Sequence, residues 1–174
     1  MKQRFFLLCL LALSIFIYFN IVLGSEDNGA VRVKAPSMGQ AGAQFYYSKN
    51  MNPFYPEYAP YYKNSRGYVI GNCTWYAWGR ACEIRGSKPE HSLTGNASEW
   101  WEKNKKGGYY PFGKNPERGA IICYKTHVGV VEQAKPLIIS ESGWTVDKKR
   151  NPIIFHCGKP WRKKENPLGF IYIK

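Results

Sequence analysis

The stretch that decides the fold is GNCTWYAWGRA, residues 71–81. Gly71-Asn72 is typical of a turn, and the residues after Cys73 place apolar side chains at helical spacing until Gly86, which offers a stop. The sequence therefore predicts a helix that begins at Cys73. The N-terminus of a helix has free backbone N–H groups and a partial positive charge, which stabilise a thiolate. Cys73 is thus a candidate nucleophile.

The hydrophobic pattern changes downstream of this helix. A second short helix is predicted near Asn96, with Ala97, Trp100 and Trp101 facing inward. Strand-like runs with short connectors then follow, at residues 119–124, 127–133, 137–141 and 169–173. Helices followed by consecutive antiparallel strands predict an α+β domain.

The first 24 residues have the pattern of a secretory signal peptide. Lys2 and Arg4 precede an apolar run, and a candidate cleavage site lies before Ser25. The alternative is an uncleaved membrane anchor over residues 5–23, which is close to transmembrane length. Both interpretations place the remainder of the chain outside the cytoplasm. We therefore expect a secreted or membrane-anchored protein.

The segment after the leader has two parts. Residues 25–51 are expected to be a linker, because their first part is rich in Gly, Ala and polar residues without a period, and residues 52–174 to be the folded domain. Residues 45–66 contain eight aromatic residues and three prolines. Their rings either pack on the domain or stay exposed to bind sugar. Packing is favoured, because so many exposed rings would promote aggregation.

The net charge of the chain is +13, and it is +11 without Lys2 and Arg4 of the leader. Such an excess of positive charge predicts an anionic partner. For an exported chain, an anionic cell-wall polymer or a lipid surface is favoured over nucleic acid. The alternative is that the charge only keeps the protein soluble.

Four cysteines remain after the leader: Cys73, Cys82, Cys123 and Cys157. An even number in an exported chain permits disulfides, but a nucleophile must stay a thiol. We expect Cys82 and Cys123 to be small buried hydrophobic residues rather than a bridge.

A base and an acid for the nucleophile are present further along the chain. His127 begins one predicted strand, and Glu141 ends the next. If Val131 pairs with Ile138 in a hairpin, His127 and Glu141 become neighbours at one end of the sheet. A carboxylate beside a histidine can fix its tautomer and stabilise its charged form. Spacing alone makes this set a candidate and no more.

Other polar and aromatic residues have weaker signals. Glu132 is expected to form a salt bridge or to lie at the surface rather than to act as a second acid. Asn72 could donate to an oxyanion, although a turn role is favoured. Trp144, on a predicted loop, could stack on substrate, whereas Trp75 is expected in the core. No metal-binding motif is present in the sequence, so no metal or other cofactor is predicted.

Six segments resemble, in order, those of CHAP domains, the cysteine/histidine-dependent amidohydrolase/peptidase family. They are GNCTWYAWGRACEI, TGNASEWW, PERGAII, HVGVVE, IISESGW and LGFIYI. The similarity covers about residues 52–173. It implies a papain-like fold, in which a helical side carrying Cys73 packs on an antiparallel sheet carrying His127.

The resemblance also implies the chemistry. CHAP domains cleave amide bonds in peptidoglycan, and Cys73, His127 and Glu141 match their nucleophile, base and acidic residue. Many members have Asn two residues after the acid, where this chain has Gly143. The implied function is that of a cell-wall hydrolase, either an N-acetylmuramoyl-L-alanine amidase or an endopeptidase of the peptide cross-links. The alternatives are a cysteine peptidase or transamidase acting on protein, and a wall-binding module without activity.

Overall fold

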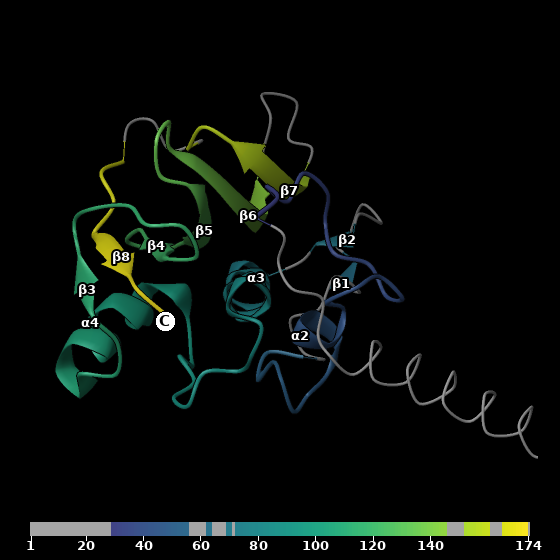
Figure 1. The fold of residues 1–174 in the computed structure, drawn as a ribbon, viewed down its shortest axis with the longest axis horizontal. Helices are drawn as coiled ribbons and strands as arrows, with labels where there is room; N and C mark the ends of the chain where they lie inside the picture. The colour runs from purple at the N-terminus through teal and green to yellow at the C-terminus, as the bar shows by residue number, and fades with distance from the viewer. Residues whose placement is uncertain are drawn as a thin grey trace, which may run out of the picture.

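The computed structural model describes residues 29–55, 62–63, 69–70, 72–145, 152–160 and 165–173. The protein has an α+β fold in which a few helices pack on an antiparallel six-stranded sheet, which is the arrangement expected from the resemblance to CHAP domains (Figure 1). The helices are α2 (Gln44–Tyr47), α3 (Cys73–Arg85) and α4 (Ala97–Gly107). The strands of the large sheet are β3 (Phe112–Gly113), β4 (Ile121–Cys123), β5 (Val128–Gln133), β6 (Ile138–Thr145), β7 (Pro152–Gly158) and β8 (Gly169–Ile171), in the order β3-β8-β4-β5-β6-β7. A separate two-stranded sheet pairs β1 (Tyr62–Lys63) with β2 (Val69–Ile70).

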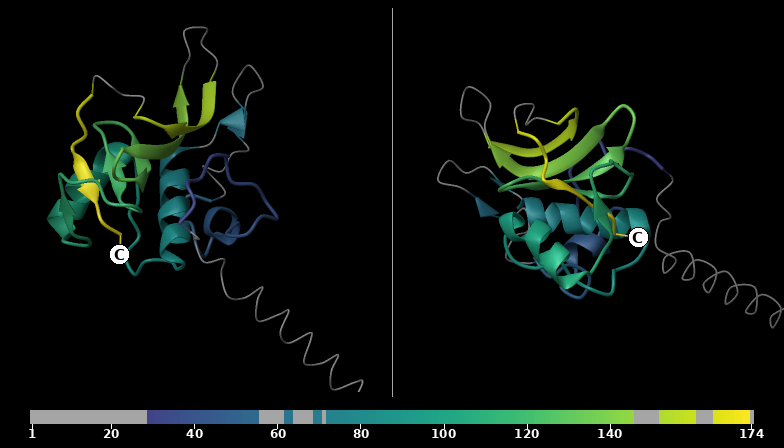
Figure 2. Two further views of the ribbon diagram at one scale, coloured as in Figure 1. Left: turned by 45° about the horizontal axis from the view of Figure 1, so that its top comes forward. Right: turned by 90° about the vertical axis from the view of Figure 1, so that its left-hand side faces the viewer.

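Helix α3 lies at the centre of the molecule, beneath the large sheet (Figure 2). As predicted, it begins at Cys73 and is terminated by Gly86, whose φ of 76° is the left-handed conformation that glycine adopts easily. All its residues from Thr74 to Glu83 are buried. Because α3 contacts the rest of the protein on all sides, its position is fixed by packing. Cys73, its first residue, is therefore held in a defined place.

The segment before α3 packs against it. Phe45 and Tyr46 of α2 are buried, and the indole N–H of Trp75 donates to the Tyr46 carbonyl at 2.7 Å. Gly79 permits this contact, since a Cβ there would lie 2.3 Å from the Tyr46 ring. The expectation of a linker over residues 25–51 therefore does not describe residues 42–51, which help to build the core. The aromatic stretch packs on the domain over residues 45–55, and the rest of it lies mostly outside the described residues.

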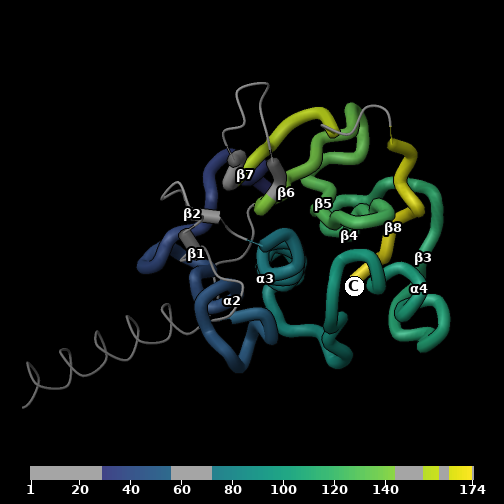
Figure 3. Tube along the Cα trace, turned by 180° about the vertical axis from the view of Figure 1, so that it is seen from behind, coloured from purple at the N-terminus to yellow at the C-terminus, as the bar shows by residue number. Residues whose placement is uncertain are grey.

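Helix α4 also follows the prediction. Asn96 caps it and exchanges hydrogen bonds with Glu99 in a capping box. Trp100 and Trp101 face inward and are buried. Figures 1 and 3 place α4 and α2 on opposite sides of α3.

The strand register differs from the predicted one by one residue. Val131 pairs with Ile139 rather than Ile138, because the turn takes up residues 134–137 and the first pair beside it is Gln133 with Ile138. The ladder between β5 and β6 then shifts by one residue between Val131 and Gln133. The extra residue in β5 is Glu132. A shift of one residue moves every following side chain to the other face of the sheet, so this bulge decides which residues share a face with Glu141.

Two other strand expectations change. Strand β6 continues to Thr145, so Glu141 lies within the strand rather than at its end, and Trp144 lies on a strand rather than on a loop. Strand β7 was not predicted, although it forms the edge of the sheet.

In the part of the chain that the structure describes, no helix is both long and apolar enough to cross a membrane. Residues 5–23 lie outside that part.

Candidate active site

Cys73 is the first residue of α3 and is only partly buried. The preceding Asn72 caps the helix, since its side-chain oxygen accepts from the backbone N–H of Thr74 at 2.7 Å. The first backbone N–H groups of a helix have no partner within it. The Cys73 sulfur therefore lies at the positive end of the helix, beside N–H groups that can bind an anion.

Two residues from the sheet complete a hydrogen-bonded chain with Cys73. His127 precedes β5, and its Nε2 lies 2.7 Å from Oε2 of Glu141 on β6. His127 is also hydrogen-bonded to the Cys73 side chain. Because Nε2 is occupied by Glu141, Nδ1 is the ring nitrogen available to Cys73. His127 and Glu141 are each only 1% exposed, whereas Cys73 can be reached from solvent.

The surroundings of His127 favour its charged form. Burial lowers the pKa of the imidazole, but hydrogen bonds to Cys73 and Glu141, together with the negative charge of these groups, outweigh it and raise the pKa to about 9. A histidine that stays protonated beside a cysteine stabilises the thiolate. The imidazolium form of His127 is therefore favoured between the Cys73 side chain and the Glu141 carboxylate.

Gly129 permits a close approach between β5 and β6 beside Glu141. Val130 pairs with Ser140, which sets Gly129 opposite Glu141. Alternation along the strands then puts His127, Gly129 and Glu141 on one face, in agreement with the 2.7 Å contact. A Cβ at Gly129 would lie 3.3 Å from Cβ of Glu141. Sequence reasoning missed this residue, although a glycine within a strand-like run is the signal of such an approach.

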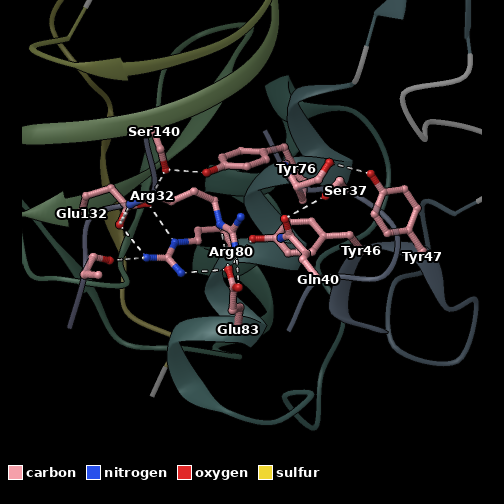
Figure 4. Close-up of polar contacts among 12 residues, drawn as sticks. Arg32, Ser37, Gln40, Tyr46, Tyr47, Tyr76, Arg80, Glu83, Glu132 and Ser140 are labelled. Carbon is pink, nitrogen blue, oxygen red and sulfur yellow. Dashed lines mark hydrogen bonds and ion pairs between the residues drawn. The ribbon is translucent and has the colours of Figure 1, made fainter. Parts of the chain in front are cut away.

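A second group of polar side chains lies on α3, β5, β6 and the N-terminal segment (Figure 4). Arg80 of α3 donates to both carboxylate oxygens of Glu132 at 2.7 and 2.8 Å, and to Glu83 at 2.8 Å. Ser140 donates to Glu132, and Arg32 of the N-terminal segment pairs with Glu83. These five residues, the arginine–glutamate network, tie the N-terminal segment, α3, β5 and β6 together. Glu132 thus forms a salt bridge, as expected, but a buried one.

The other predicted residues lie as follows. Asn72 uses its side-chain oxygen in the cap, so only its amide nitrogen is left to donate to an oxyanion. Trp75 is a core residue, as predicted. The backbone of Trp144 lies on β6, three residues beyond Glu141, and its side chain is outside the described part of the structure.

The remaining cysteines differ from Cys73. Cys82 and Cys123 are buried and form no disulfide, which confirms the expectation of small core residues. Burial raises the pKa of the Cys82 thiol to about 12 and raises that of Cys123 as well. A buried thiol with a raised pKa is a poor nucleophile. Cys157 is partly buried, and its pKa is also raised by burial. Among the described residues, no group of three His, Cys, Asp or Glu side chains could hold a metal ion.

Comparison with protein families agrees with this geometry. Residues 62–143 match the model of the CHAP domain family. This part of the chain is therefore similar to CHAP domains. The matched region begins at β1, includes α3, and ends just after Glu141, so it contains Cys73, His127 and Glu141.

A comparison with curated proteins found a relative in Staphylococcus aureus (strain NCTC 8325 / PS 47), named "Probable autolysin LDP". The two sequences are 37% identical over 102 residues. The aligned part is 53% of this chain and 35% of the relative. The chain thus spans about a third of the length of that protein.

Proposed function

We propose that this protein is a peptidoglycan hydrolase that cleaves an amide bond of the cell wall with Cys73 as nucleophile. The CHAP domain and the similarity to a probable autolysin support the substrate class. The observation that carries the mechanism is the hydrogen-bonded chain from Cys73 through His127 to Glu141.

The first half of the proposed reaction forms a covalent intermediate. The thiolate of Cys73 attacks the amide carbonyl carbon, and the carbonyl oxygen becomes an oxyanion. The backbone N–H of Cys73 at the start of α3 is the first donor to this oxyanion, and the amide of Asn72 is a candidate second donor. His127 then gives its proton to the leaving nitrogen, the C–N bond breaks, and a thioester remains.

Hydrolysis completes the cycle. Neutral His127 takes a proton from a water molecule, whose oxygen attacks the thioester carbon. The C–S bond then breaks, which releases the acid and restores the thiolate beside imidazolium. Glu141 keeps the ring oriented and stabilises its positive charge in the resting state and in the thiolate-releasing step. Trp144, next to the last residue of β6, is a candidate stacking surface for substrate.

The wall lies outside the cytoplasm, so this function requires export. Residues 1–24 are proposed to direct it, either as a cleaved signal peptide or as an anchor over residues 5–23. The positive charge is proposed to bring the enzyme to anionic wall polymers.

The test is digestion of purified cell walls by the wild type and by Cys73→Ala. We expect Cys73→Ala to lose all lysis while unfolding at the temperature of the wild type, because one partly buried sulfur contributes little to stability. Cys73→Ser should be nearly inactive, since a hydroxyl does not ionise in this site. Cys82→Ala is the matched control: it should keep its activity but lose some stability through a small cavity.

Mass spectrometry of the released fragments identifies the bond. New N-terminal alanine on stem peptides indicates an amidase, whereas new N-termini within the cross-links indicate an endopeptidase. Substantial lysis by Cys73→Ala would contradict thiol chemistry. Cleavage of a protein substrate without cleavage of walls would favour a cysteine peptidase instead.

A further inference from the structure

Helix α4 borders a pocket of about 420 Å³ that belongs to no part of the candidate active site. This volume lies within the range of small-ligand sites, roughly 300–1,000 Å³. The pocket is lined by the hydroxyl-bearing residues Ser92 and Thr94, by Lys103 and Lys106, and by Tyr109. We propose that it binds an anionic polysaccharide of the cell wall, and so holds the enzyme on its substrate. This proposal rests on the proposed function for the identity of the polymer, but not for the binding itself.

The positive charge of the pocket is only partly neutralised by the protein. Lys103 is fixed by Glu99 at 2.9 Å and by the Thr94 carbonyl at 3.4 Å. Lys106 lies on the same side of α4 one turn later, because residues three apart are neighbours on a helix. No ion pair joins Lys106 to a carboxylate of the described chain. An anionic group in the pocket would therefore meet the ammonium of Lys103, which is held in place, and that of Lys106, which forms no ion pair with the residues that the structure describes.

Tyr109 offers a ring that is exposed and yet held firmly. Its side chain is 45% exposed, although it is a large aromatic residue. The ring lies over Gly107, where a Cβ would come within 2.4 Å of it. The next residue is fixed by buried Asn104, whose side chain bonds both the N–H and the carbonyl of Tyr110 at 3.0 and 2.9 Å. A ring positioned in this way loses little conformational entropy when a ligand stacks on it.

The chemistry of these groups suits a charged sugar chain. An aromatic face packs on the apolar face of a sugar ring, and hydroxyl groups exchange hydrogen bonds with sugar hydroxyls. Lysine recognises phosphate or carboxylate as a point charge, without the planar geometry that arginine requires. The pocket thus combines an aromatic platform, two hydroxyl-bearing residues and two ammonium groups.

The position of the pocket separates it from the reaction. Ser92 and Thr94 follow the end of α3 that is remote from Cys73, and a helix of 13 residues is about 20 Å long. A polymer bound there could remain bound while another part of the wall enters the active site. Binding and cleavage should therefore respond to different substitutions.

The experiment measures cosedimentation of inactive Cys73→Ala protein with purified cell walls. In this background, Lys106→Glu and Tyr109→Leu are each expected to weaken binding about 5- to 10-fold, which corresponds to roughly 1–1.4 kcal/mol. The matched controls are Lys34→Glu and Met38→Ala, which change exposed residues of the N-terminal segment. Figures 1 and 3 show this segment on the side of α3 away from α4. The controls should bind within about twofold of the parent at a salt concentration that screens long-range attraction between charges but leaves direct contacts largely intact.

Two further arms identify the polymer and separate this proposal from the proposed function. Walls stripped of phosphate polymers with hydrofluoric acid distinguish phosphate groups from the carboxylates of peptidoglycan: the effect of Lys106→Glu disappears on stripped walls in the first case and persists in the second. With active Cys73, Lys106→Glu should hydrolyse a small soluble muropeptide at the wild-type rate. The proposal is overturned if both pocket variants bind walls like the parent, if Lys34→Glu weakens binding equally, or if the effect is seen only on anionic lipid vesicles.

Discussion

Glu132 and Glu141 lie on neighbouring strands and are equally buried, at 1% exposure, yet their surroundings differ. Both oxygens of Glu132 have several donors: Arg80 and Ser140 on one, Arg80 and the Arg32 backbone on the other. Glu141 binds His127 through Oε2, whereas its Oε1 has no hydrogen-bond partner among the residues that the structure describes.

This difference separates a structural carboxylate from one available for chemistry. A buried charge whose oxygens are all satisfied holds its partners in one arrangement. Glu141 instead contacts a histidine that is hydrogen-bonded to a partly exposed thiol, and one of its oxygens is unused. Such a carboxylate can stabilise the positive charge of the histidine when that charge forms. The two glutamates are nine positions apart in the sequence, and only their partners distinguish them.

The largest expected effect comes from breaking the arginine–glutamate network. Arg80→Met removes the cation from two buried carboxylates, and loss of one partner of a buried pair costs about 3–5 kcal/mol. We expect a loss of this size in the free energy of unfolding, measured by urea denaturation. The double variant Arg80→Met/Glu132→Leu is the control and should recover part of the loss, because Glu83 keeps Arg32. A change below about 1 kcal/mol in the single variant would show that the network adds little to the fold.

The second expected effect is on catalysis. Glu141→Gln keeps the shape of the side chain but removes the charge that stabilises imidazolium. We expect kcat/KM to fall on the order of tenfold to a thousandfold, together with some loss of stability, because the charge of Glu141 helps to keep buried His127 protonated. Glu132→Gln should show a different pattern, a loss of stability with activity retained while the protein is folded. If Glu141→Gln is as active as the wild type, another group must hold the histidine.

The third effect concerns pH. The pKa of folded His127, about 9, is above the ordinary value of 6.5, so the folded state binds this proton more tightly. The resulting stabilisation is complete below pH 6.5 and is lost as the pH rises through about 9. We therefore expect the melting temperature to fall over this window and the activity to decline near pH 9. In Glu141→Gln the decline should begin at a lower pH, because one cause of the raised pKa is absent. Identical pH profiles for the two proteins would contradict this role of Glu141.

The sequence predicted the elements that have a strong local signal. Helices α3 and α4 have caps and helical spacing, and β4, β5, β6 and β8 are apolar runs between connectors. The candidate site followed from the same features, since Cys73 begins a helix and His127 precedes a strand.

Features that depend on distant contacts were not predictable. The aromatic residues from Phe45 onward were expected to pack on the domain, but their partners were not predictable, such as Gly79 and Trp75 for Tyr46. The shift at Glu132 has no signal in a strand-like run, because the arginine that draws this residue into the interior lies 52 positions away. The predicted register did not include that shift.

The smallest expected effect concerns Gly143, which stands where many CHAP domains have Asn. Its φ is 72°, the left-handed conformation that costs most residues about 1–2 kcal/mol but costs Asn less. Gly143→Asn should therefore lower the melting temperature less than Gly143→Ala does. Residues 141 and 143 lie two apart on β6, so the new amide could also donate to Oε1 of Glu141.

Activity distinguishes these two consequences of Gly143→Asn. If the amide reaches Oε1, kcat/KM should stay within about threefold of the wild type, and the stability of the Asn variant should exceed that of the Ala variant by more than their difference in backbone preference, about 1 kcal/mol. Equal destabilisation by Asn and Ala would show that the free oxygen of Glu141 is not reached from position 143. That oxygen would then remain available to water or substrate, which is the feature that separates Glu141 from Glu132.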